Sequence, residues 1–186
     1  MRITGGEWGG RILVAPKGLD VRPTQDRVRE ALWSMLMNEI SGASFLDLFA
    51  GTGAVGLDAL SRGAARATFV ELDRRHLEAV RANAAALPGA SARAEFVLAD
   101  AYQWIATAGR GRRFDLAFAD PPYALGAERG LAGALAALAQ GDVVRHGGVF
   151  AAETGARQRA EEAVGWDLCR DREYGKTRLL VYRRHA

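Results

Sequence analysis

The stretch Phe-Leu-Asp-Leu-Phe-Ala-Gly-Thr-Gly-Ala-Val-Gly, residues 45–56, sets the architecture of this chain. Its first half, 45–49, is typical of a buried strand, because four of its five residues are large and apolar. Its second half holds Gly51, Gly53 and Gly56, which match the G-x-G-x-x-G pattern of a nucleotide-binding turn. Glycine permits the left-handed backbone of such a turn and lets a ligand approach the main chain. The pattern predicts an α/β fold in which this strand leads through the turn into a helix.

Acidic residues lie in or just after four predicted strands. Asp47 lies inside the first strand, and Glu71, Asp100 and Asp120 stand at the ends of the runs 67–71, 95–98 and 114–119. Ligands of open α/β sheets bind beyond the carboxyl ends of the strands, so we expect these acids to face one crevice. Asp100 is predicted to contact an adenine amino group, although a helix N-cap at this position has the same sequence pattern.

The acids also indicate which nucleotide binds. Glu71 follows the glycine turn at about the 20-residue spacing of an acid that binds ribose hydroxyls. Asp47 lies where a dinucleotide fold places a pyrophosphate, and a carboxylate there would repel phosphate. S-adenosylmethionine has no phosphate and carries an ammonium and a sulfonium. We therefore favour S-adenosylmethionine over NAD as the cofactor.

The motif Asp120-Pro-Pro-Tyr123 is the most specific signal in the chain. Two consecutive prolines fix φ and force the preceding residues toward extended backbone, which makes a rigid corner. Such a corner can accept hydrogen bonds from a planar amino group, while Tyr123 stacks on the ring that bears it. A plain turn after a strand is the alternative interpretation.

Both ends of the chain are predicted to add smaller elements. Residues 1–16 read as a hairpin arm whose Trp8 we expect to pack inward. In the stretch 21–30, Val-Arg-Pro-Thr-Gln-Asp-Arg-Val-Arg-Glu, Thr24 is a good N-cap for a following helix. The first turn of this helix is either solvated or part of a lid over the cofactor pocket. In the lid, Thr24 or Arg27 would reach into the pocket. Near the C-terminus we predict a helix at 157–164 and two strands, 166–170 and 178–182, that form an antiparallel hairpin.

Composition limits the remaining possibilities. A chain of 186 residues with 49% hydrophobic residues suits one core, which we divide into an arm at 1–20 and a main domain at 21–186. The single cysteine, Cys169, excludes an internal disulfide and a cysteine metal cluster, and we expect it in the core. We predict no metal site. We also expect a cytoplasmic protein, because no signal peptide or apolar span is recognisable.

Positive charge collects at the two ends. Residues 1–29 hold six basic and three acidic residues, and residues 157–186 hold eight basic and five acidic ones. Basic ends around an acidic centre suit a polyanionic substrate and a cationic cofactor.

The motifs together resemble a known family. Asp47-x-x-x-Gly51-x-Gly53, Glu71, Asp100 and Asp-Pro-Pro-Tyr resemble class I S-adenosylmethionine-dependent N-methyltransferases. Arg2-Ile-Thr-Gly-Gly, Arg22-Pro-Thr-x-Asp-Arg-Val-Arg-Glu and Tyr174-Gly-Lys-Thr narrow this to a resemblance to the RsmD family over nearly the whole chain. That family methylates the exocyclic 2-amino group of a guanine in bacterial 16S ribosomal RNA.

The resemblance implies a fold and a set of roles. The fold would be a mostly parallel seven-stranded Rossmann-like sheet with a C-terminal antiparallel hairpin and an N-terminal hairpin arm. Asp120, Pro121 and Tyr123 would receive the guanine. Cofactor contacts would come from Thr24, Arg27, Asp47, Phe49, Gly51, Gly53, Glu71, Leu72, Asp100, Ala101 and Asp120. From the positive charge at the two ends, and not from the resemblance, we predict RNA contacts by Arg2, Arg11, Arg22, Lys176 and Arg178. Lys176 and Arg178 could equally be surface residues of a turn without a ligand.

Some alternatives stay open at this point. The Asp-Pro-Pro-Tyr corner is shared with methyltransferases that act on DNA adenine or on a protein glutamine. An NAD-dependent oxidoreductase would leave that corner unexplained and would lack room for a substrate domain. A non-catalytic RNA-binding module would leave the strand-end acids unexplained. We expect a monomer that acts on 16S RNA within a small-subunit particle.

Overall fold

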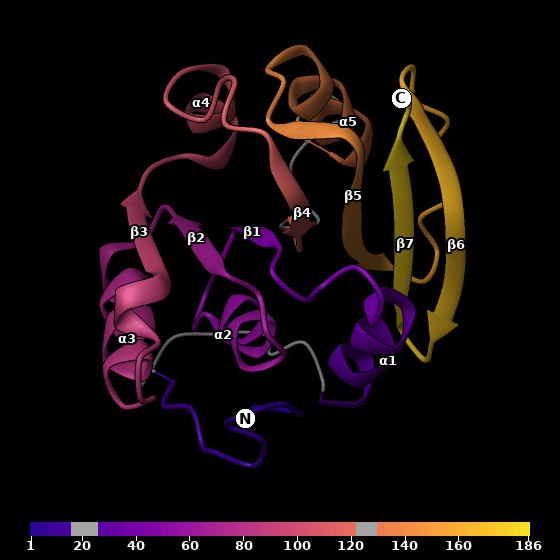
Figure 1. The fold of residues 1–186 in the computed structure, drawn as a ribbon. Coiled ribbons are helices and arrows are strands. Elements are labelled where there is room, and N and C mark those ends of the chain that lie inside the picture. The colour runs from indigo at the N-terminus through magenta and orange to yellow at the C-terminus, as the bar shows by residue number, and fades with distance from the viewer. Residues whose placement is uncertain (16–25, 122–129) are drawn as a thin grey trace.

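The computed structural model describes residues 1–15, 26–121 and 130–186. Seven strands form one sheet in the order β3-β2-β1-β4-β5-β7-β6 (Figure 1). The first five strands in this order run parallel, and β7 is antiparallel to both β5 and β6. The strands are β1 Ser44–Leu48, β2 Arg66–Glu71, β3 Ala94–Leu98, β4 Phe114–Ala119, β5 Val144–Gly155, β6 Trp166–Tyr174 and β7 Thr177–Arg184. The predicted class I methyltransferase sheet with its closing hairpin is confirmed.

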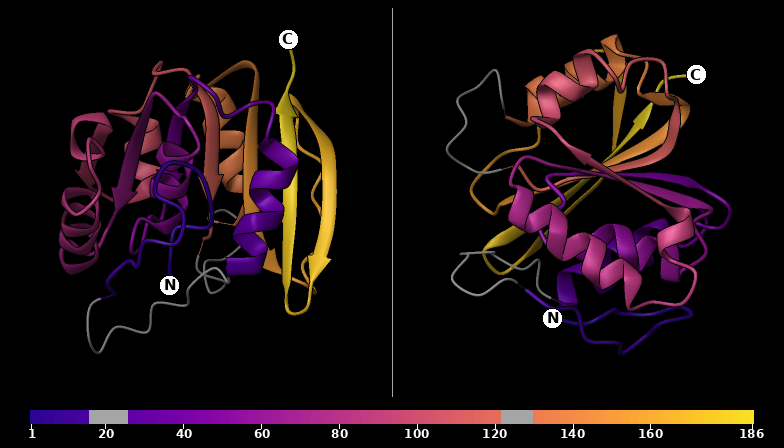
Figure 2. Two further views of the ribbon diagram at one scale, coloured as in Figure 1. Left: turned by 60° about the horizontal axis from the view of Figure 1, so that its bottom comes forward. Right: turned by 90° about the vertical axis from the view of Figure 1, so that its left-hand side faces the viewer.

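Helices cover both faces of the sheet, as the two views of Figure 2 show. One face packs against α1 (Asp26–Leu36), α2 (Ala54–Ser61) and α3 (Arg74–Ala85), and the other against α4 (Ala101–Ala106) and α5 (Leu131–Gln140). All five residues of β1 are buried. A strand covered on both faces reads as a continuous apolar run, so the interruption by Asp47 calls for a compensating partner.

The parallel strands β1–β5 end at one side of the sheet, which we call the carboxyl edge. Asp47 lies near this edge in the centre of the sheet, because β1 pairs Asp47 with Phe69 of β2 and with Phe118 of β4. The β6–β7 turn reaches the same edge, since Thr177 pairs with Gly155, the last residue of β5. The fold therefore brings together at the carboxyl edge segments that are more than a hundred residues apart in sequence.

Two local predictions are wrong. Residues 157–164 form no helix. Main-chain groups of this segment make hydrogen bonds to side chains of β7 instead of to one another. Arg178 donates to the carbonyls of Ala156 and Gln158, and the Tyr182 hydroxyl accepts from the amide of Glu161. Cys169 is exposed rather than buried, since a register shift between Leu168 and Arg170 disturbs β6 at the edge of the sheet. Within the described residues, no helix has the length and apolar character needed to cross a bilayer.

Candidate cofactor and substrate site

The buried carboxylate of Asp47 organises the start of α2. Its side chain is 1% exposed, and Oδ2 accepts a hydrogen bond from the Gly56 amide at 2.8 Å. That bond satisfies one of the free amides at the helix N-terminus. Gly56 is needed for this approach, because an added Cβ would lie 2.3 Å from a ring carbon of Phe69 and 3.0 Å from Asp47 Oδ2.

The turn between β1 and α2 follows a left-handed path. Phe49, Gly51 and Gly53 have φ angles of 62°, 57° and 78°. Glycine adopts this region at little cost, but Phe49 does so only because its surroundings hold it, and such strain clusters at functional sites. Its half-buried ring packs against Tyr102 of α4 at a centroid distance of 5.9 Å. Tyr102 is a residue that the sequence motifs did not single out.

We expect Gly53→Ala to destabilise the protein by about 2–4 kcal/mol. A left-handed alanine costs roughly 1 kcal/mol, and overpacking adds about 1–3 kcal/mol, because the new Cβ would lie 2.6 Å from Val80 Cγ1. Gly89→Ala is the matched control, since Gly89 has φ +75 and nothing within 4 Å of an added Cβ. Urea unfolding of both variants tests this: equal losses would show that contact with Val80 contributes nothing.

Glu71 ties the end of β2 to the glycine turn. Its Oε2 accepts from the Gly51 amide at 2.8 Å, and its Oε1 accepts from the Asp73 amide at 2.9 Å. His76 Nδ1 lies 3.6 Å from the same Oε1. A carboxylate has about four acceptor positions, so these bonds leave capacity for ribose hydroxyls. The next residue, Leu72, is 68% exposed, which is unusual for a leucine directly after a buried strand.

Burial raises the pKa of Asp47 well above its ordinary value. The bond from Gly56 lowers this pKa, whereas the charges of Glu71 and Asp120 raise it further. Asp47 therefore interacts electrostatically with Glu71 and Asp120, the acids at the end of β2 and just after β4. Among the described residues, no group of His, Cys, Asp or Glu side chains is arranged to hold a metal ion. An organic cation fits such an arrangement, because it would relieve the repulsion among the carboxylates.

Two further predicted contacts lie at the ends of β3 and β4. Asp100 is the N-cap of α4 and accepts from the Gln103 amide at 3.0 Å, so the capping interpretation is confirmed, and a contact with adenine stays a prediction. Ala101 is buried beneath it. Asp120 is half-buried directly after β4, and Pro121 is buried. Thr24, Arg22 and Tyr123 lie outside the described residues.

The N-terminal arm packs against α2 and α3 rather than extending into solvent. Asn83 of α3, 3% exposed, accepts from the Val14 amide at 2.8 Å and donates to the carbonyls of Val14 and Thr52, both at 3.0 Å. Thr52 belongs to the glycine turn, so one amide side chain joins the arm to the candidate cofactor site. A lone asparagine in the apolar stripe of a helix is the signal that would have revealed it.

Arg29 is completely buried, and the interpretation of the start of α1 as a solvated turn is wrong at this residue. Its Nε lies 3.1 Å from Asp58 Oδ2, and its guanidinium donates to the Arg2 carbonyl. Arg27 is exposed, and its role in a lid stays a prediction. Trp8 packs inward as predicted, 3% exposed, with the Arg93 guanidinium 4.9 Å from its ring centroid.

Known proteins share this architecture. A family model described as conserved hypothetical protein 95 matches residues 1–183. The chain belongs to this family, the RsmD family. Ribosomal RNA small subunit methyltransferase D of Escherichia coli is 44% identical over 126 residues, which make up 68% of this chain and 62% of that protein. The alignment thus spans less than two thirds of that relative.

One further relative and one solved structure align with more of this RsmD-family chain. The protein of the same name from Haemophilus influenzae is 31% identical over 183 residues, 98% of this chain and 93% of that one. The solved structure of yhhF from Escherichia coli covers 100% of this chain and 98% of its own, with a TM-score of 0.87 and 33% identity.

In this RsmD-family chain, the residues predicted to contact RNA differ in their surroundings. Arg2 pairs with Asp26 at 3.2 Å, and Arg11 is exposed on the arm. Lys176 is exposed in the β6–β7 turn. Arg178 has an 18% exposed side chain and binds Asp171 through two bonds of 2.6 and 2.7 Å. Contact of these residues with RNA stays a prediction.

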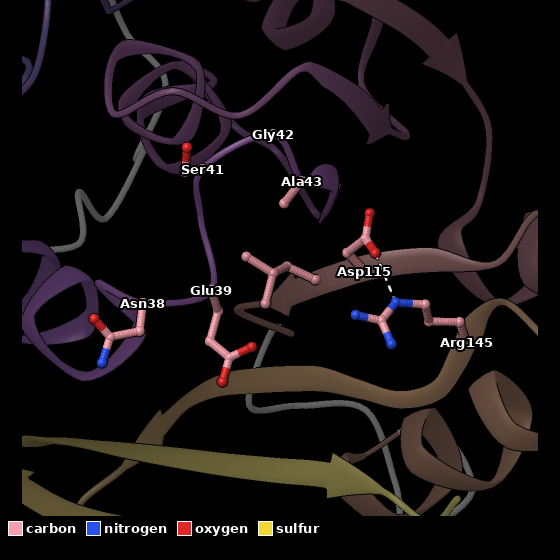
Figure 3. A pocket seen from close by; sticks show the side chains of 8 residues that line it. Asn38, Glu39, Ser41, Gly42, Ala43, Asp115 and Arg145 are labelled. Atoms are coloured by element: carbon pink, nitrogen blue, oxygen red, sulfur yellow. Dashed lines mark hydrogen bonds and ion pairs between the residues drawn. The ribbon is translucent and has the colours of Figure 1, made fainter.

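A small polar pocket of about 220 Å³ lies at the opposite edge of the sheet, where β1 and β4 begin (Figure 3). Arg145 Nε binds Asp115 Oδ1 at 2.6 Å across it, and Asp115 Oδ2 accepts from the amide and the hydroxyl of Ser44 at 2.8 and 2.7 Å. Glu39 on its rim pairs with Arg183 at 2.5 Å. Because these charged groups satisfy one another, the pocket is not the candidate site of the RsmD-family chain.

Proposed function

We propose that this protein transfers a methyl group from S-adenosylmethionine to the exocyclic 2-amino group of a guanine in bacterial 16S ribosomal RNA. Relatives that carry the name ribosomal RNA small subunit methyltransferase D support the substrate class. The observation that carries the proposal is the grouping of Asp47, Glu71 and Asp120 at the carboxyl edge, around a left-handed glycine turn. Asp120 and Pro121 directly follow β4, the strand that pairs with β1.

The residues at this edge fit the cofactor. Asp47, Gly51 and Gly53 would hold its amino-acid end, Glu71 its ribose, and Asp100 with Ala101 its adenine, beside the exposed Leu72. The raised pKa of Asp47 shows a carboxyl that is costly to ionise without a nearby positive charge. The bound cofactor supplies an electrophilic methyl group, and the protein supplies the charge and shape that position it.

The remaining groups would orient the acceptor. A guanine amine is a weak nucleophile, because its lone pair is delocalised into the ring. Hydrogen bonds from its two N–H groups to the Asp120 carboxylate and the Pro121 carbonyl would turn that lone pair toward the methyl group. Positioning of this kind supplies up to roughly 7–11 kcal/mol. Asp120 would accept the amine proton after transfer or pass it to water.

The target base has to leave its stack to reach these groups, as in other enzymes that modify a base. Stacking on Tyr123 would offset part of that cost, since base–aromatic stacking contributes about 1–3 kcal/mol per base. Bacterial 16S RNA is made and assembled in the cytoplasm, so we place the protein there, as a monomer acting on a small-subunit particle.

Cofactor affinity is expected to depend on the charge of Asp47. A cationic ligand favours the ionised carboxylate, so affinity should rise as the pH increases through the raised pKa of Asp47, as long as the α-ammonium of the ligand stays protonated. In Asp47→Asn the affinity should fall about 10–100-fold, the loss of one charged hydrogen bond, and its pH dependence should flatten. Titration calorimetry with S-adenosylmethionine measures both quantities.

The Asp47 variant also has a defined effect on stability. Because the folded pKa of Asp47 is raised, its contribution favours the folded state at low pH and is lost as the pH rises. Asp47→Asn should therefore keep or raise the free energy of unfolding at pH 8. His76→Gln serves as the control, because it removes the imidazole 3.6 Å from Glu71 Oε1 and keeps Asp47. A wild-type pH profile in Asp47→Asn would contradict the assigned role.

The proposal is tested by transfer of labelled methyl from S-adenosylmethionine to unmodified 16S RNA and to the corresponding small-subunit particle, followed by nucleoside analysis. Label on the 2-amino group of guanine in either sample supports it, and the better sample identifies the substrate form. Tight cofactor binding without label in either sample would overturn the RNA assignment and favour DNA adenine or another amine acceptor.

A further inference from the structure

Two turns meet at the carboxyl edge beside the candidate site. One is the β6–β7 turn at Gly175 and Lys176, and the other follows β5 at residues 155–158. The Ala156 amide donates to the Lys176 carbonyl at 2.9 Å, and the Gln158 amide donates to the Gly155 carbonyl at 2.9 Å. These main-chain bonds set the two turns side by side.

Arg178 braces this junction. Its Nε and Nη2 bind the two carboxylate oxygens of Asp171, and its Nη1 donates to the carbonyls of Ala156 and Gln158 at 3.4 and 3.2 Å. Glu173 lies 3.4 Å from the same nitrogen. All three nitrogens of the guanidinium thus have protein partners, and two carboxylates balance its positive charge. These bonds fit a structural role better than the phosphate contact predicted from the sequence.

The braced turns carry two cations of a different kind. Arg157 and Lys176 are both exposed, and neither has a carboxylate partner within the residues that the structure describes. The carboxylates nearest in sequence to Lys176, Asp171 and Glu173, are engaged by Arg178. Positive charge without a partner on a rigid support suits a polyanion, because little conformational entropy is lost on binding.

We propose that Arg157 and Lys176 form a phosphate-binding platform for the RNA next to the target nucleotide, and that Arg178 is the positioning residue that holds it. The proposal rests on the proposed function, since it takes RNA as the substrate. The order β4-β5-β7 puts the platform two strands, or roughly 10 Å, from the end of β4 that carries Asp120. That offset places a neighbouring phosphate, and not the reacting guanine, over the platform.

The test is the salt dependence of binding to unmodified 16S RNA. Each phosphate contact contributes about 0.7–0.9 to the slope of log affinity against log salt, so Arg157→Gln/Lys176→Gln should lower the slope by about 1.4–1.8. The matched control is Arg66→Gln/Arg110→Gln, which removes two exposed cations from the opposite edge of the sheet. S-adenosylmethionine affinity should stay unchanged in both, which shows that they are folded.

The Asp171→Asn variant tests the brace. It removes a negative charge, so long-range electrostatics alone predicts tighter RNA binding. A positioning role for Arg178 predicts the opposite, weaker binding, because the platform loses its support. Tighter binding in Asp171→Asn would overturn that role.

The platform and the proposed function can fail separately. If the wild-type protein methylates RNA but the double variant keeps the wild-type slope, the platform is wrong and the function stands. If no RNA is methylated, the salt dependence of RNA binding still tests whether the platform exists. A lower slope in Arg157→Gln/Lys176→Gln than in the control variant supports the platform, and equal slopes in the two variants overturn it.

Discussion

Asp120→Ala is expected to slow methyl transfer to RNA by about 10²–10⁴-fold, the range typical of losing a positioned acid–base group. Asp120 stands directly after β4, beside β1 and its glycine turn, and its charge reaches Asp47. Without this carboxylate the guanine amine loses the acceptor that orients its lone pair and takes its proton. Single-turnover transfer of labelled methyl, with saturating cofactor, measures the chemical step.

The affinity of the same variant for S-adenosylmethionine should fall by at most about 10–100-fold, since one hydrogen bond to a charged group is the most that is lost. Asp167→Ala is the matched control: Asp167 is exposed on β6, away from the carboxyl-edge acids, and its side chain lies 3.1 Å from His185 Nε2. Transfer by Asp120→Ala at the wild-type rate would refute the mechanism.

Asp58→Ala is expected to lower the free energy of unfolding by about 3–5 kcal/mol, the usual cost of leaving one partner of a buried ion pair alone. The side chains of Arg29 and Asp58 are both fully buried. Asp58 also accepts from the amide and hydroxyl of Thr4 at 2.6 and 2.7 Å and from Trp33 Nε1 at 3.3 Å. Urea unfolding followed by tryptophan fluorescence measures the loss.

Burial raises the pKa of Asp58, although the charge of Arg29 lowers it. Burying this ion pair therefore costs free energy of desolvation, and removing one partner costs free energy as well. Arg29→Met/Asp58→Leu, which removes both charges, should therefore recover most of the stability. The exposed pair of Arg75 and Asp73 provides the control, and Arg75→Ala should leave the unfolding midpoint unchanged. If the double variant were as unstable as the sum of its single changes, the charge argument would be wrong.

The arm illustrates why part of the site could not be predicted. Its hairpin pattern and the inward packing of Trp8 were recognisable from the sequence. Its attachment depends on Asn83 and Asp58, which lie 69 and 54 residues from their partners Val14 and Thr4. A polar residue on the apolar side of a helix signals that it needs a partner, but no local pattern says which distant residue that partner is.

The cations show the same limit. Arg29, Arg178 and Lys176 all read as basic residues near a helix start or turn. The sequence placed Arg29 in a helix start that was either solvated or part of a lid, and it predicted RNA contacts for Lys176 and Arg178. In the structure Arg29 is buried against Asp58, Arg178 is bonded to Asp171, and Lys176 is exposed. The roles differ because each depends on which carboxylates and carbonyls the fold brings within reach.

The residues of this chain were sufficient to predict the glycine turn, the acids in and after the parallel strands, and the strands that carry those acids. These features follow from local periodicity, turn chemistry and the rule that parallel strands end at one edge. The predictions of a helix at 157–164 and of a buried Cys169 were wrong. The bonds from Arg178 and Tyr182 that replace the helix, and the register shift of β6 at Cys169, arise only after distant strands pair. Long-range packing likewise set the partners of each charged side chain, since electrostatic and hydrogen-bonding energies depend on distances that sequence separation does not contain.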